Sequence, residues 1–157
     1  MPLFSAPSLS INLPLSALFG TAMAGVATGS LAFGSFVDVR SFLEHVKTHK
    51  TSLIQQHFSV WWPFGRDYMV PVLVCGTVAN ITAYVQTSHV NFAYAAGLIA
   101  LIAPYTSIIL GEDIEALRKS NVKEVAATTK RFCQLHHPRL VIAATAFGLA
   151  LVALAEL

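Results

Sequence analysis

Three long stretches of this chain carry no charged side chain, and they limit the folds open to it. Aspartate, glutamate, lysine and arginine are absent from residues 1–37, 68–111 and 140–155. An α-helix rises about 1.5 Å per residue and the hydrocarbon core of a bilayer is about 30 Å thick, so about 20 residues cross it. Because each stretch is apolar and close to this length or longer, the chain is expected to be an integral membrane protein.

The middle uncharged stretch is too long for one crossing, because its 44 residues would form a helix of about 66 Å. We expect it to fold back once at the polar sequence Gln86-Thr87-Ser88-His89. The last stretch is short, about 24 Å as a helix, and the side chain of Arg139 is expected to reach the headgroups at its start. The predicted fold is all-α, a four-helix transmembrane bundle forming one domain over residues 1–157, with spans near 13–37, 68–85, 91–110 and 140–155.

Composition agrees with this prediction. Of the 157 residues 55% are hydrophobic and only 11% are charged, whereas soluble proteins carry roughly 25% charged residues. These values exclude a disordered chain, a coiled coil and an ordinary soluble enzyme. The net charge of +2 is too small to indicate a nucleic-acid partner, and two cysteines far apart in the sequence form no disulfide framework or zinc-finger pattern. The expected partner is the lipid bilayer.

All ten lysines and arginines fall in two segments, residues 38–67 and 111–139. Four spans place both segments on one side of the membrane, as two basic loops or interfacial helices, and both termini on the other side. An excess of lysine and arginine marks the cytoplasmic or matrix side of a membrane. The membrane itself is left open, with the mitochondrial inner membrane and the endoplasmic reticulum as the two candidates.

Small residues form a stripe along the first predicted span, at spacings of three and four: Ala22, Gly25, Gly29, Ala32 and Ser35. Small residues on one helix face let two backbones approach closely. The stripe is expected to pack inside the chain's own bundle or, through Gly25 and Gly29, against another membrane subunit.

The predicted spans contain polar residues but no aspartate, glutamate, lysine or arginine, which argues against a pump or a proton-coupled transporter. Thr77, Asn80 and Tyr84 share a face of the second span, where Asn80 is expected either to line a small polar pocket or to make an interhelical hydrogen bond. Pro104 is predicted to break the third span.

Five of the six histidines lie in the basic segments, and two of them, His45 and His49, are four residues apart. If residues 38–57 are helical, both imidazoles share one face and form half of a metal site; the alternative is a solvated interfacial helix. Since no carboxylate or cysteine completes the set at a recognised spacing, no metal is assigned.

Two aromatic motifs border the spans on the basic side. The first is Trp61-Trp62-Pro63-Phe64-Gly65-Arg66, which suits either the aromatic belt of a membrane protein or a roof over a flat aromatic ligand, with Arg66 donating hydrogen bonds to its oxygens. In the second, Phe132, His136 and Arg139 share one helix face. A histidine there is suited to proton abstraction; the alternative is an interfacial cluster without chemistry.

In their order and spacing these motifs resemble the anthrone oxygenase family of small four-span membrane proteins, over about residues 17–152. The resemblance rests on the Gly/Ala-rich first span with Ala24-Gly25 and Gly29-Ser30, the stretch from Trp61 to Met69, and the elements Pro104-Tyr105-Thr106 and Phe132-x-x-x-His136-x-x-Arg139. Two features depart from the family pattern: Gly111-Glu112-Asp113 stands where Pro-Thr-Asn is usual, and Phe132 replaces a more common tryptophan.

The resemblance implies an enzyme that adds O2 to an anthrone-type substrate without a metal or organic cofactor. A base removes an acidic C–H proton from the aromatic substrate, and the resulting anion reacts with O2. The residues assigned by this resemblance are His136 as the base, Arg139 and Arg66 as oxyanion donors, and Trp61, Asn80 and Tyr105 as substrate-binding residues.

The alternative is a non-catalytic accessory subunit of a larger membrane complex, for example a respiratory one. It is supported by the stripe at Gly25 and Gly29, by the absence of a buried acidic residue and by the missing Pro-Thr-Asn element. The amphipathic stretch 112–135 suits either an interfacial helix or a docking surface.

Overall fold

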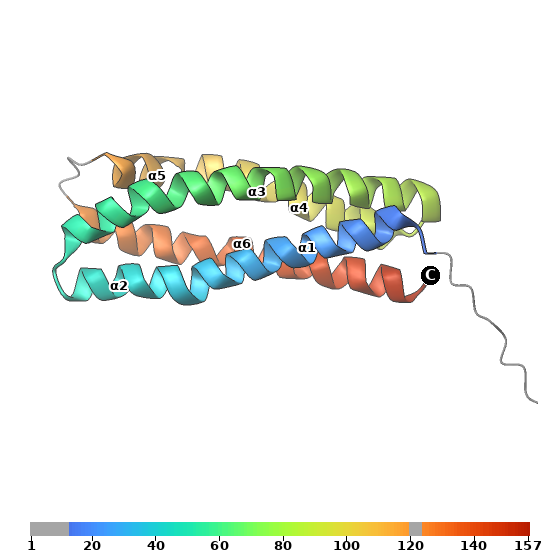
Figure 1. Ribbon diagram of the computed structural model, residues 1–157, viewed down its shortest axis with the longest axis horizontal. Coiled ribbons are helices and arrows are strands. Elements are labelled where there is room, and N and C mark those ends of the chain that lie inside the picture. The colour runs from blue at the N-terminus through green and yellow to red at the C-terminus, as the bar shows by residue number, and fades with distance from the viewer. Residues whose placement is uncertain (1–12, 120–123) are drawn as a thin grey trace, which may run out of the picture.

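The computed structural model describes residues 13–119 and 124–157, and its elements form an antiparallel helical bundle (Figure 1). The first helical run consists of α1 (Leu15–Phe33), the π-helical turn η1 (Gly34–Asp38) and α2 (Val39–Lys47) without a break. It is followed by α3 (Thr51–Thr87), α4 (Val90–Ile109), the short α5 (Gly111–Arg118) and α6 (Val125–Ala155). The predicted all-α four-helix bundle is therefore confirmed.

Four helical runs are long and apolar enough to cross a membrane: Leu15–Lys47, Thr51–Thr87, Val90–Ile109 and Val125–Ala155. Three of them extend well beyond the predicted spans. The 37 residues of α3 reach about 56 Å, nearly twice the thickness of the hydrocarbon core. Much of this length therefore lies beyond one bilayer thickness.

Along its long axis, the bundle consists of an uncharged half followed by a charged half. The uncharged half contains the start of α1, the end of α6 (Figure 1) and the parts of the helices that correspond to the predicted spans. Its outer surface is apolar: on α3, Val74, Val78, Ile81 and Val85 are 49–73% exposed. Exposed valine and isoleucine in such numbers suit contact with lipid. The charged half holds α2, α5 and the first turns of α3 and α6.

The short connection between α3 and α4 lies in the predicted polar sequence, at Ser88 and His89. Ser88 adopts a left-handed conformation with φ of 59°. His89 reaches across to the end of the chain, where its Nε2 lies 2.5 Å from a carboxylate oxygen of Glu156. This contact ties the turn to the end of α6.

At the opposite end, the turn between α2 and α3 separates the two histidines proposed as half of a metal site. His45 lies in the last turn of α2, whereas His49 lies beyond it with φ of 57°. Residues 38–57 are therefore not one continuous helix, and His45 and His49 do not share a helix face.

Prolines do not interrupt these helices. Pro104 lies inside α4, which continues without a break to Ile109, so the prediction that it breaks the third span is wrong. Pro63 and Pro71 in α3 and Pro138 in α6 are also accommodated. A single proline removes one backbone hydrogen bond, and packing of the helix against its neighbours on both sides of the proline holds it in line.

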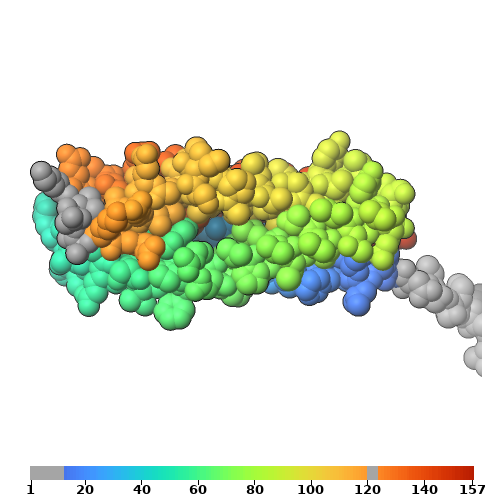
Figure 2. Space-filling model, turned by 90° about the horizontal axis from the view of Figure 1, so that it is seen from above, coloured from blue at the N-terminus to red at the C-terminus, as the bar shows by residue number. Residues whose placement is uncertain are grey.

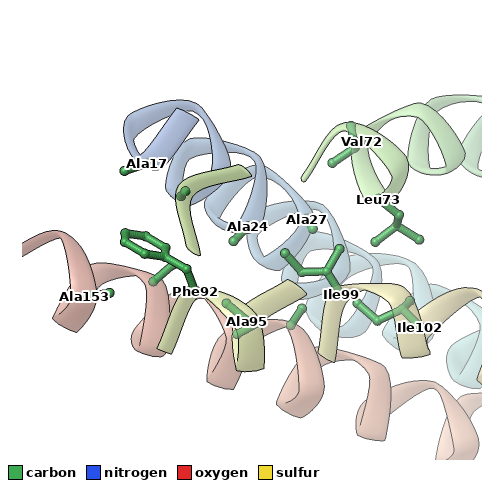
Figure 3. Packing of buried hydrophobic residues seen from close by; sticks show 14 of the residues in the cluster. Ala17, Ala24, Ala27, Val72, Leu73, Phe92, Ala95, Ile99, Ile102 and Ala153 are labelled. Atoms are coloured by element: carbon green, nitrogen blue, oxygen red, sulfur yellow. The ribbon is translucent and has the colours of Figure 1, made fainter. Parts of the chain in front are cut away.

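Each half of the bundle has its own hydrophobic core. In the uncharged half, alanines of α1 and α6 pack with Phe92, Ile99 and Ile102 of α4 (Figure 3). The small side chains let the helices approach closely, as is usual in membrane bundles. In the charged half the core is built from larger residues, with Phe42, Phe58 and Phe132 fully buried at its centre.

The small-residue stripe of α1 does not act as one surface. The helix buries a neighbouring face instead, and Gly25 packs inside the bundle, where an added Cβ would lie 3.0 Å from the ring of Phe147 in α6. Gly29 has no atom within 4 Å of such a Cβ. The interpretation of the stripe as packing within the chain's own bundle therefore holds at Gly25.

Candidate functional site

A cavity of about 640 Å³ lies where the uncharged and charged halves meet, between the first helical run, α3, α4 and α6. Figure 2 shows the molecule hollowed at this level between α3 and α4, with blue atoms of the first helical run visible at the bottom. Its lining is mostly apolar, and its polar members come from all four helical runs: Ser30, Asp38, Trp61, Trp62, Arg66, Tyr68, Thr106, Ser107, His136 and Arg139.

His136 and Arg139 form the buried polar part of this lining. They are 1% and 4% exposed, and an Nη of Arg139 contacts Nδ1 of His136. The other Nη of Arg139 donates to the hydroxyl of Thr106 in α4 at 3.3 Å. In the part of the chain that the structure describes, no carboxylate forms an ion pair with Arg139. The guanidinium is thus buried without a counter-ion.

The buried position of Arg139 differs from the prediction that its side chain reaches the headgroups. The physical reason is its helical register. Arg139 follows Phe132 and His136 by seven and three residues, so all three point to the same side of α6, and that side faces the interior. Because α6 begins at Val125, residue 139 lies well inside the helix instead of at its end.

Besides its contact with Arg139, the imidazole of His136 packs against aromatic rings. The ring of Phe132 lies 5.9 Å from the imidazole of His136, centroid to centroid, and 5.1 Å from the ring of Phe58 in an edge-on arrangement. Trp61 completes the group at 6.3 Å from Phe132. Such edge-on contacts orient neighbouring rings, so the indole and the imidazole that line the cavity are held by a packed aromatic cluster.

Asp38 is a cavity residue that the sequence reasoning did not identify. Its carboxylate is 9% exposed and accepts a hydrogen bond from the indole Nε1 of Trp61 at 2.8 Å. The first predicted span stopped at residue 37, one position earlier. The signal that would have found Asp38 is the continuing helical spacing of the apolar residues Val39, Phe42 and Val46, all of which are buried. The expectation of no buried acidic residue, which supported the accessory-subunit alternative, is wrong at Asp38.

Gly34 makes room for the imidazole at the start of η1. A Cβ at this position would lie 3.2 Å from Nε2 of His136 and 3.9 Å from the indole of Trp61. A methyl group here would therefore displace the imidazole, whereas its contact with the indole would be an ordinary one. Single π-helical turns within α-helices occur often at functional sites, and η1 contributes both Gly34 and Asp38 to this cavity.

Arg66 lines the mouth of the cavity and remains accessible to solvent. Its side chain is 52% exposed and pairs with the neighbouring carboxylate of Asp67 at 2.7 Å. Of the predicted site residues, the structure therefore brings four together around one cavity: Trp61, Arg66, His136 and Arg139.

Asn80 and Tyr105 lie outside the lining of this cavity. Asn80 is fully buried in the uncharged half, where its Nδ2 donates to the carbonyl of Gly76 in its own helix at 2.8 Å and its amide packs against Gly20 of α1. The hydroxyl of Tyr105 donates to the carbonyl of Leu135 at 3.1 Å and so ties α4 to α6. In the structure both residues therefore contact neighbouring helices.

The fold and this site define a class: an integral-membrane four-helix bundle with an apolar cavity at the junction of its two halves. Within the described ranges, no three histidine, cysteine, aspartate or glutamate residues are placed to hold a metal ion. Comparison of the chain with family models, curated proteins and solved structures finds no match. The function must therefore be argued from the cavity itself.

Proposed function

We propose that this protein is a membrane-bound oxygenase. In this proposal the cavity binds a flat polycyclic aromatic ketone of the anthrone type, removes a proton from its activated CH2 group, and lets the resulting anion react with O2. The observation that carries the proposal is the contact between His136 and Arg139, which are buried beside a mostly apolar cavity without a carboxylate partner among the described residues.

The size and lining of the cavity suit such a substrate. Small-molecule sites generally occupy about 300–1,000 Å³, with mostly apolar walls and a few polar groups that fix orientation, and this cavity of about 640 Å³ fits that description. The indole of Trp61 offers a flat surface for ring stacking. Leu73 and Ile102 supply apolar walls from α3 and α4.

The charge arrangement favours an anionic oxygen in the cavity. Removing a charge from water is costly unless the charge is paired, and among the described residues the guanidinium of Arg139 makes hydrogen bonds only with His136 and Thr106. An oxygen that gains negative charge when the substrate loses its proton would complete this set. Preorganised donors that stabilise developing charge commonly contribute a large part of a catalytic effect.

The depth of the cavity suits a substrate that partitions into lipid. Measured from the ends of the uncharged half, Gly34 is 19 residues from Leu15, and Arg139 is 16 residues from Ala155. These separations correspond to about 28 Å and 24 Å along the helices, close to the thickness of the hydrocarbon core. The opening between α3 and α4 (Figure 2) then lies near the headgroup level, where an apolar ring system is able to enter.

The overall reaction balances with O2 as the only co-reactant. The CH2 group of the substrate loses one proton to a basic side chain, and the carbanion transfers electrons to O2 to form a C–O bond as a peroxide. Protonation gives the hydroperoxide, which loses water as the second C–H bond breaks and a ketone forms. Carbon is oxidised from CH2 to C=O while one oxygen atom leaves as water. Two cavity residues are able to accept the first proton, His136 and Asp38.

The test is oxygen uptake by the purified protein supplied with an anthrone, together with product analysis. The proposal expects one O2 consumed and one quinone formed per substrate, faster than in detergent alone. Arg139→Gln is expected to reduce the rate about 100-fold, in the range found when one charge-stabilising donor is lost. Arg131→Gln is the matched control, because Arg131 lies on the same helix but outside the cavity, with a 58% exposed side chain. Equal rates with and without protein would refute the proposal.

The accessory-subunit alternative stays a prediction. With Gly25 occupied by Phe147 of the same chain, the packing of the stripe does not favour it. The native mass in mild detergent separates the two functions: a species of one to a few copies of 16.9 kDa agrees with a self-sufficient enzyme, and a complex of many other chains agrees with the alternative.

A further inference from the structure

We infer that Asp38 is the proton acceptor of this site and that His136 holds Arg139 in place instead of accepting the proton. This inference rests on the proposed function and deepens it, because it assigns the base for the first step. It differs from the role of base that the sequence suggests for His136.

The contact between Arg139 and His136 decides which imidazole nitrogen carries the proton. A guanidinium has five N–H donors and no acceptor, so Nδ1 of His136 must accept the hydrogen bond from Arg139. The proton of a neutral imidazole is then on Nε2, since the partner of one ring nitrogen determines the state of the other. Nε2 lies on the side of Gly34, which also lines the cavity, and has no protein partner within the described residues. Nε2 is itself buried and carries an N–H, so His136 has no free lone pair with which to accept a proton from the substrate.

Asp38 supplies the lone pair that the site otherwise lacks. It is the only carboxylate among the described residues that line the cavity. The indole of Trp61 donates to Oδ2 at 2.8 Å, which fixes the carboxylate while Oδ1 keeps its acceptor capacity. A carboxylate held in this way inside a mostly apolar site is suited to act as a general base.

Trp61 links the two roles in space. The indole Nε1 donates to Asp38, and Cζ2 on the same edge of the ring lies 3.9 Å from the Cβ position of Gly34, which is itself 3.2 Å from Nε2 of His136. The carboxylate and the imidazole thus lie near one edge of the same indole. A flat ketone stacked on this indole would place its CH2 group near Asp38 and its carbonyl oxygen near Arg139.

The proton-transfer step has a simple balance. The C–H bond of the substrate breaks, its proton forms an O–H bond with Oδ1 of Asp38, and the electron pair stays on the substrate as an enolate. The negative charge moves to the carbonyl oxygen, where the charge of Arg139 stabilises it. The protonated Asp38 then returns the proton when the peroxide forms.

The test is hydrogen–deuterium exchange at the CH2 group of an anthrone without O2, compared with detergent alone. Wild-type protein is expected to accelerate exchange, and Asp38→Asn to lower that acceleration about 100-fold, within the range of general base catalysis. Because asparagine keeps an oxygen to accept from Trp61, we expect the Kd for anthraquinone to change less than about twofold. Glu44→Gln is the matched control, as Glu44 is exposed on α2 and pairs with Lys47.

Each outcome has a distinct meaning. Wild-type exchange rates in Asp38→Asn, with loss of exchange in His136→Gln, would overturn the inference and make His136 the base. Exchange in the wild-type protein without oxygen uptake would refute the oxygenase proposal and leave Asp38 as the base of a proton-transfer site. If the wild-type protein does not accelerate exchange, both are overturned. Asp38→Glu, which keeps the carboxylate, is expected to recover part of the activity and so separates loss of the base from loss of folding.

Discussion

Gly34 offers the sharpest structural test of the site, because a single methyl group there would touch its central side chain. In Gly34→Ala the new Cβ would lie 3.2 Å from Nε2 and 3.3 Å from Cε1 of His136. Ordinary contacts begin at about 3.4 Å, so the imidazole must move by a few tenths of an ångström. Arg139 and Phe132 pack against the same ring and oppose that movement.

The magnitude follows from two opposing terms. Replacing glycine by alanine inside a helix stabilises it by about 1 kcal/mol, whereas adding a methyl group to a tightly packed position costs typically about 1–3 kcal/mol. Gly34→Ala is therefore expected to be up to about 2 kcal/mol less stable than wild type. A displacement of 1 Å in a catalytic group costs about 100-fold in rate, so a few tenths of an ångström is expected to cost roughly three- to tenfold.

Gly148→Ala is the matched control, since Gly148 lies on α6, outside the cavity, with no atom within 4 Å of an added Cβ. Thermal unfolding in detergent, followed by circular dichroism, and the exchange rate of the anthrone CH2 group give the two readouts. Gly148→Ala is expected to equal or exceed wild-type stability and to keep its rate. If Gly34→Ala matched Gly148→Ala in both readouts, the approach of His136 to Gly34 would be disproved.

Three further predictions concern stability. In Gly20→Ala the new Cβ would lie 2.9 Å from the amide of Asn80. This overpacking between α1 and α3 is expected to lower the free energy of unfolding by about 1–3 kcal/mol. Unchanged thermal stability would contradict the close contact between Gly20 and Asn80. Phe132→Ala removes a fully buried ring and is expected to lower the free energy of unfolding by about 3–5 kcal/mol, so that less folded protein is recovered after extraction. A decrease below about 1 kcal/mol would contradict the packing of Phe132 in the aromatic core. Burial raises the pKa of Asp113, although the charge of Arg131 opposes the rise. Because the folded state binds this proton more tightly, stability is expected to fall as pH rises from the ordinary value of 3.8 through the raised pKa. In Asp113→Asn the free energy of unfolding should depend less on pH over this range. A pH dependence equal to that of the wild type would argue against a raised pKa of Asp113.

The helices were predictable from the sequence because charged groups are costly inside hydrocarbon. The uncharged stretches were therefore expected to form helices long and apolar enough to cross a membrane, as they do, and the turn at Ser88 follows from the same argument. The limits of the helices were not predictable in this way. A charge such as Asp38 marks the edge of the uncharged stretch, but the helix continues past it through buried apolar residues of α2 to Lys47.

The candidate site was predictable where helical spacing and residue chemistry agree. Phe132, His136 and Arg139 share a face of one helix, and that face lies inside the bundle. Spacing gives a face but not the neighbour that it meets, which is why Asn80 packs against Gly20 and Tyr105 donates to a backbone carbonyl, both outside the cavity lining. Arg139 was expected at the headgroups because the last span was predicted to begin at residue 140, whereas α6 begins at Val125 and its inward face includes Arg139.

The most direct measurement is a titration of the purified protein with anthraquinone, followed by tryptophan fluorescence. The chain has two tryptophans, Trp61 and Trp62, and both line the cavity, so a bound aromatic ring system would quench them. The account predicts saturable quenching at one ligand per chain, with weaker affinity in Arg139→Gln, which loses the charge that faces the ligand oxygen. Quenching that rises linearly with ligand and is identical in the variant would show partition into detergent and would contradict a binding site in this cavity.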